Sequence, residues 1–186
     1  NLVDPDLKNF FNYLLSNQSL NLILSGQKLP TNDIDSMDDS VVEFRIGGIE
    51  ESDAKDFLKS LGITAQDSVL ESIHESSRGY PWVLNLVGVA LQILDMTPEK
   101  LLEEIKEQKI PLENCIIEKL LDKLSYSERL LLSYIALFRH PVNIPVLHAI
   151  LPAVETINKD LKTLSDLLLI KFSGRRYYVN TLVRRI

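Results

Sequence analysis

A forced helix break at Gly79-Tyr80-Pro81 constrains the fold of this chain more than any other feature of its sequence. Proline is accepted in the first turn of a helix, where its missing N–H would have no partner anyway, and it breaks a helix almost anywhere else. The residues before the break are polar, and residues 82–90 are nearly all apolar. The sequence therefore predicts one helix that ends near Arg78 and another that starts at Pro81.

The sequence pattern is helical throughout residues 50–108. Cap residues, glycines and prolines divide this stretch into four helices joined by short loops. Ser52 and Asp53 offer a favourable cap to the first of them. The predicted helices cover residues 52–61, 66–77, 81–95 and 98–108. We expect these four helices to form a small bundle.

The first part of the chain has a different pattern. An amphipathic helix is predicted around residues 7–15, and the short apolar segments 19–25 and 41–46 predict two buried strands, the second closed by Gly47-Gly48. A sheet of two strands is too small to be stable alone. We therefore interpret residues 1–48 as the remnant of an α/β domain whose sheet continues upstream, and the chain as part of a longer protein.

The last part of the chain has the layout of a winged helix. A helix is predicted over 111–124, and the capping box Ser125-Tyr126-Ser127-Glu128 opens another that runs to Phe138. Two more helices, over 144–150 and 152–168, precede a strand, a turn and a strand in residues 169–180. The predicted fold is mainly α, with the α/β remnant at 1–48, a four-helix lid bundle at 49–110 and a winged-helix domain at 111–186.

Charge, cysteine content and hydrophobicity indicate the kind of surfaces, compartment and partners that the chain has. Residues 1–115 hold 9 Lys and Arg against 20 Asp and Glu, whereas residues 116–186 hold 11 against 6, so two modules with different surfaces are expected. The lone Cys115 lies in an apolar helical setting, which favours a buried structural thiol and a reducing, cytoplasmic compartment. No apolar run reaches the length of a membrane span, so no membrane partner is expected.

In their order, the strand, the helical bundle and the winged helix resemble the distal half of a STAND-type module, the NB-ARC-like branch of the AAA+ ATPases. The similarity covers nearly the whole chain. It implies that Gly79-Tyr80-Pro81 matches the family's Gly-x-Pro motif, whose proline packs against the adenine and ribose of a bound nucleotide. A donor-free proline ring at a helix start suits such a flat ligand.

The resemblance also assigns two phosphate-binding positions. Gln27 stands where the family has a sensor arginine at the end of a strand, and the change removes a charge-assisted hydrogen bond worth about 1.5–3 kcal/mol. Asn180 stands where a histidine of the winged helix reaches the β-phosphate of ADP. An alternative reading of Asn180 is a polar cap between the second wing strand and the last helix.

Phosphate-loop and paired-acid motifs do not occur in the sequence. The resemblance implies that they lie in an upstream phosphate-loop domain, so the chain alone would not hydrolyse ATP, whereas the longer protein could be a slow ATPase. It further implies ADP or ATP with Mg²⁺ as the cofactor, and effector or sensor domains and a homo-oligomer as partners. The nucleotide would switch the conformation of a signalling protein.

Two other functions remain open. A winged helix with a net positive charge could read DNA, with Lys159 and Lys162 on its third helix and Arg175 and Arg176 at the tip of the wing. Against this, the third helix also carries acids. A protein-interaction scaffold with a decayed nucleotide site is the third reading. His74, His140 and His148 lie on different elements without metal-ligand spacing, so no metal site is predicted.

Overall fold

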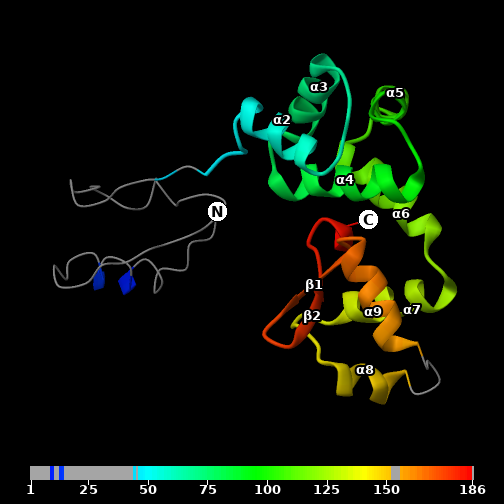
Figure 1. Cartoon of the computed structure of the whole chain (residues 1–186). Helices are drawn as coiled ribbons and strands as arrows, with labels where there is room; N and C mark the ends of the chain where they lie inside the picture. Colours follow the sequence, from blue (N-terminus) through cyan, green and yellow to red (C-terminus); the bar gives the residue numbers. More distant parts are fainter. Residues whose placement is uncertain (1–8, 11–12, 15–43, 45, 152–155, 186) are drawn as a thin grey trace. The chain divides into compact units, whose positions relative to one another are not determined.

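The computed structural model describes residues 9–10, 13–14, 44, 46–151 and 156–185 (Figure 1). The chain divides into two units, Asn1–Ile46 and Gly47–Ile186. The strand predicted over 19–25, and with it Gln27, lies outside the described residues. Of the strand predicted over 41–46, Phe44 and Ile46 are described. Neither belongs to a strand, and they are 84% and 96% exposed, so the prediction of a buried strand is wrong at these residues. The fold of the described part is mainly α with one small two-stranded sheet, which agrees with the predicted fold class.

Four helices form the bundle predicted for the first half of the second unit (Figure 1). They are α2 (Glu51–Ser60), α3 (Asp67–Ser77), α4 (Pro81–Leu94) and α5 (Pro98–Gln108). Helix α4 is apolar over most of its circumference and packs against α2 and α3, while α3 also contacts α5. An apolar helix of this kind is stable only when neighbours cover it on several sides, so α4 is the central helix of the bundle.

Within the bundle, the helix ends follow the predicted breaks to within one residue, with one exception in the cap of α2. Proline occupies the first turn of both α4 and α5, and the Thr97 side chain caps α5 by accepting from the N–H of Lys100 at 3.3 Å. The predicted cap at Ser52 and Asp53 is wrong. Helix α2 already begins at Glu51, and Glu50 holds the cap position without a side-chain hydrogen bond. Ser52 and Asp53 therefore lie within the first turn.

The winged-helix layout is also present. Helices α6 (Leu112–Lys123), α7 (Tyr126–Leu137), α8 (Ile144–Ile150) and α9 (Ile157–Asp166) precede strands β1 (Ile170–Ser173) and β2 (Arg176–Val179) and a short 3₁₀ helix, η1 (Val183–Arg185). The strands are antiparallel, with Ile170 opposite Val179. Val142 adds a bridge to Tyr177 through two backbone hydrogen bonds of 2.7 and 2.8 Å. Helix α7 packs against α9 and β2.

A single hydrophobic core runs through both halves of this unit. Helix α6, at the start of the predicted winged-helix domain, packs against α4 and α3 of the bundle. Its residues Cys115, Ile116, Ile117 and Leu120 are buried, and burial raises the pKa of the Cys115 thiol. The thiol is thus a protonated core group, as expected from its apolar surroundings.

The capping box of α7 makes a pH-dependent contribution to stability. Ser125 Oγ accepts from the N–H of Glu128 at 3.3 Å, and Glu128 Oε2 accepts from the N–H of Ser125 at 2.8 Å. Partial burial by itself raises the pKa of Glu128. Hydrogen bonds from Ser125 and Thr163 and the charge of Lys159 outweigh it, so the pKa lies below the ordinary 4.5.

Replacing the carboxylate of Glu128 tests this contribution. A carboxyl group with a lowered pKa stabilises the folded state above its unfolded-state pKa, and this stability is lost as the pH falls through the folded-state value. We expect Glu128→Gln to lower the free energy of unfolding by about 0.5–1 kcal/mol at pH 7, and the difference from the wild type to shrink below pH 4. Urea unfolding of both proteins at several pH values measures this. An equal difference at pH 7 and pH 3 would contradict it.

Candidate functional site

The turn between α3 and α4 is built from two successive residues in the left-handed region. Arg78 has φ of 54° and Gly79 has φ of 65°. Their N–H groups donate to the carbonyls of Glu75 and His74, both at 3.1 Å, which is the Schellman pattern of a helix end. The Tyr80 N–H donates to the Ser77 carbonyl at 3.1 Å. The predicted end near Arg78 and start at Pro81 are confirmed.

A second segment of backbone lies directly against this turn. The Ile49 N–H donates to the Gly79 carbonyl at 2.9 Å, and His74 Nε2 lies 3.0 Å from the Ile49 carbonyl. A carbonyl oxygen can only accept, so His74 donates through a protonated Nε2. Both polar backbone groups of Ile49 therefore hold it against the turn: the N–H binds the Gly79 carbonyl, and the carbonyl binds the His74 imidazole.

Two glycines make this close approach possible. A Cβ added to Gly48 would lie 2.0 Å from the Arg78 carbonyl oxygen, and one added to Gly79 would lie 2.5 Å from the Ile49 carbonyl oxygen. Real Cβ atoms do not approach backbone oxygens so closely, and a glycine at each position avoids the overlap. We call this contact of residues 48–49 with residues 78–79 the backbone crossing.

The turn presents Tyr80 and Pro81 to solvent beside the exposed Arg78 side chain. Tyr80 is 51% exposed and Pro81 is exposed, whereas Trp82 is half-buried and packs against the core. Trp82 Nε1 is buried and has no hydrogen-bond partner within the described residues. No side chain caps the start of α4. The N–H groups of its first turn are consequently available to solvent or to a ligand.

Asn180 lies in the segment between β2 and η1 and is 8% exposed. Its Oδ1 accepts from the Leu182 N–H at 3.1 Å, its own N–H donates to the Leu169 carbonyl at 3.2 Å, and its carbonyl accepts from the Arg184 N–H at 3.0 Å. These bonds connect the hairpin to the last turn, as in the alternative reading of Asn180 as a cap. Gln27, the other position that the resemblance assigns to phosphate binding, lies outside the described residues.

The four cations of the DNA reading are all exposed. Lys159 and Lys162 lie on α9, and Arg175 and Arg176 lie at the end of the β1–β2 hairpin. The environment of α9 is not uniformly basic. The carboxylate of Glu128 lies close enough to Lys159 for the lysine charge to lower the pKa of Glu128. The buried Asp160 on the same helix accepts from Thr156 Oγ1 at 2.8 Å.

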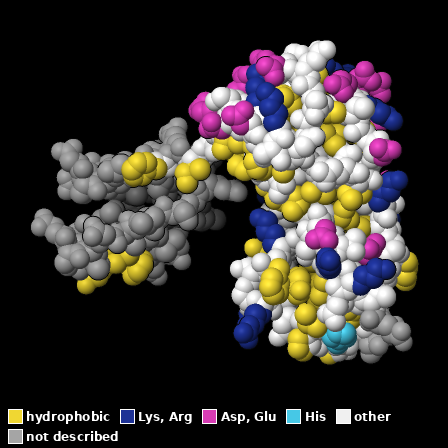
Figure 2. All heavy atoms as spheres, in the orientation of Figure 1, with side chains coloured by type: hydrophobic (Ala, Val, Ile, Leu, Met, Phe, Trp, Pro, Cys, Tyr) yellow, Lys and Arg dark blue, Asp and Glu magenta, His cyan; other side chains and the backbone are white. Residues whose placement is uncertain are grey.

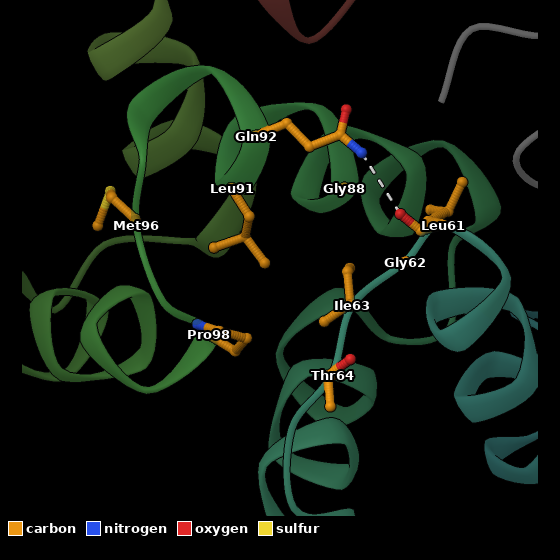
Figure 3. Close-up of a pocket in the computed structure, with 9 residues that line it drawn as sticks. All are labelled: Leu61, Gly62, Ile63, Thr64, Gly88, Leu91, Gln92, Met96 and Pro98. Carbon is orange, nitrogen blue, oxygen red and sulfur yellow. Dashed lines mark hydrogen bonds between the residues drawn. The ribbon is translucent and has the colours of Figure 1, made fainter.

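A small apolar cleft lies elsewhere in the bundle, between the α2–α3 loop, α4 and the start of α5 (Figure 3). Its volume is about 210 Å³. One hydrogen bond crosses it, from Gln92 Nε2 to the Leu61 carbonyl at 3.4 Å. The lining includes neither residues 79–81 nor Asn180. Its lining residues are Leu61, Gly62, Ile63, Thr64, Gly88, Leu91, Gln92, Met96 and Pro98.

Sequence reasoning missed the backbone crossing and the role of His74. The pair Gly47-Gly48 is the signal for the crossing in the sequence, but its pattern predicts only the end of a strand. The sequence gives no indication that the His74 side chain hydrogen-bonds to a backbone carbonyl. Both features depend on the approach of segments that are far apart in the sequence.

No protein-family model and no curated protein sequence matches the chain. Among the described residues, no helix combines the length and the apolar character that a membrane span requires.

Proposed function

We propose that this chain is the lid and winged-helix part of a STAND-like signalling switch that binds ADP or ATP. In this proposal, the turn at residues 79–81 contacts the adenine and ribose, and Asn180 contacts a phosphate. A nucleotide that touches both halves biases their relative position, so exchange of ADP for ATP changes the conformation. Mg²⁺ and the phosphate loop belong to the upstream domain that the resemblance implies.

The observation that carries the proposal is the satisfied backbone of the turn. The N–H groups of Arg78, Gly79 and Tyr80 and the Gly79 carbonyl are all hydrogen-bonded within the protein. Three side chains of the turn are exposed: Arg78 is charged, whereas Tyr80 and Pro81 offer aromatic and apolar surface. A flat aromatic base can stack on such a surface without leaving a buried polar group unpaired.

Backbone donors near this surface support a ligand with acceptors. The uncapped first turn of α4 offers backbone N–H groups and the positive end of a 14-residue helix, which favours an anion such as a phosphate. A nucleotide has both the flat apolar base and the acceptors.

Replacing Pro81 tests the adenine contact. Pro81→Ala removes about two methylene groups from the surface, worth about 0.8 kcal/mol each, which predicts about tenfold weaker ADP binding. Isothermal titration of the full-length protein with ADP measures this. The control is Pro111→Ala, which changes an exposed proline at the N-cap of α6. Equal ADP affinity in the wild type and Pro81→Ala would remove the turn from the site.

Asn180→Asp separates the phosphate contact from the cap. Aspartate keeps the oxygen that accepts from Leu182 but replaces the amide donor with a negative charge. We therefore expect ADP binding weakened by about tenfold or more, and a melting temperature lowered by a few degrees because position 180 is buried. Unchanged ADP binding would leave Asn180 with the structural role alone.

A further inference from the structure

An open hollow of about 550 Å³ lies between the start of α8 and the β1–β2 hairpin. The α8 side contributes Asn143, Ile144 and Pro145, and the hairpin contributes Phe172 and the two arginines at its turn. In Figure 2, dark blue side chains adjoin yellow hydrophobic ones at the end of this hairpin. We call this hollow the wing pocket. It contains none of the residues assigned to nucleotide binding.

The hairpin turn keeps an arginine where glycine would fit better. Gly174 has φ of 57° and Arg175 has φ of 63°, so both central residues are left-handed, as in a type I′ turn. The second of these positions is usually glycine, because other side chains are strained there. Neither the Arg175 side chain nor the Arg176 side chain has a hydrogen-bond or ion-pair partner within the described part of the chain. The Arg175 side chain therefore makes no polar contact with the described residues that would stabilise the fold and offset the backbone strain at this position.

The pocket combines positive charge with an apolar floor. Phe172 is 58% exposed and lies against the Tyr177 ring with the centroids 4.7 Å apart, and Ile144 and Pro145 also line the hollow. No aspartate or glutamate occurs among the lining residues. The two arginines are therefore free to pair with carboxylates of a partner, while the floor can bury an apolar side chain.

We propose that the wing pocket docks an acidic peptide segment of a partner protein, in which an aromatic side chain is flanked by aspartate or glutamate. Charge complementarity selects the acidic flanks, and the Phe172 floor selects the aromatic residue. A DNA backbone would supply the negative charge but no apolar side chain for the floor. The proposal is independent of the nucleotide site.

Binding of a defined peptide tests the proposal. The probe is the fluorescein-labelled peptide Glu-Asp-Phe-Asp-Glu, followed by fluorescence anisotropy with the chain described here and by ¹⁵N chemical-shift mapping. We expect shifts at residues 143–146 and 172–177, and weaker binding at 0.5 M than at 0.05 M NaCl. Arg175→Gly should weaken binding about fivefold without lowering the melting temperature, because glycine suits the turn.

A control variant and a control peptide show which results would overturn the proposal. Lys171→Ala removes an exposed hairpin cation that does not line the pocket and should leave binding unchanged. The peptide Glu-Asp-Gly-Asp-Glu should bind at least fivefold more weakly, since it lacks the aromatic side chain. The proposal is overturned if the glycine peptide binds equally well, if Arg175→Gly has no effect, or if a 20-base-pair DNA duplex binds more tightly through the same arginines.

Discussion

Gly79→Ala is expected to destabilise the protein by about 3 kcal/mol or more. The new methyl group would be held at a φ of 65° and would lie 2.5 Å from the Ile49 carbonyl oxygen and 3.0 Å from His74 Nε2. Relief requires movement of the backbone, and that movement breaks the hydrogen bond between the Ile49 N–H and the Gly79 carbonyl. Urea unfolding followed by circular dichroism measures the loss.

Two controls divide this effect into its causes. Gly62 also has a positive φ, 81°, but a Cβ there meets nothing within 4 Å, so Gly62→Ala reports the backbone strain alone, about 1 kcal/mol. Gly48→Ala reports the steric overlap alone, because the added Cβ would lie 2.0 Å from the Arg78 carbonyl oxygen. Gly47→Ala is its reference, because a Cβ at Gly47 meets nothing within 4 Å. If Gly48→Ala were as mild as Gly47→Ala, the backbone crossing would not exist in solution.

The second large effect is expected in helix α6. Ile116→Ala removes a fully buried side chain from the core and should cost about 2–5 kcal/mol, the usual range for a buried isoleucine. The exposed Glu118 on the same helix gives the control, because Glu118→Ala should stay within about 0.5 kcal/mol of the wild type. Urea unfolding of the three proteins gives the values.

Hydrogen exchange of Ile116→Ala shows which helices lose stability. Helix α6 packs against α3 and α4, and the core is continuous from the bundle to the winged helix. We therefore expect amide protection to fall in α4 as well as in α6 and α7. A loss confined to α6 and α7 would mean that the bundle and the winged helix unfold independently.

The order of elements in the described part was predictable because local signals mark its boundaries. Proline at the start of α4 and α5 and the capping box of Ser125 act within one turn of a helix. The hairpin was likewise indicated by its turn at Gly174. Such signals need no knowledge of distant residues, so a single sequence contains them.

The contacts that shape the candidate site were not predictable in the same way. The crossing joins Ile49 to residues 74 and 79, and neither its hydrogen bonds nor its short distances follow from local periodicity. The packing of α6 on α4 depends equally on the tertiary fold. The nucleotide contacts assigned to Gly79, Tyr80, Pro81 and Asn180 remain predictions for the binding experiments.

The backbone crossing has a consequence for how the sequence can change during evolution. Ile49 takes part through its main-chain N–H and carbonyl, which every residue except proline can supply. The glycines at 48 and 79 matter because they have no side chain, and His74 matters for one ring nitrogen. Divergent descendants of this chain should thus keep Gly48, His74 and Gly79 at fixed spacing, while position 49 needs only an apolar residue that packs against the core as Ile49 does. That three-residue signature offers a way to find distant relatives.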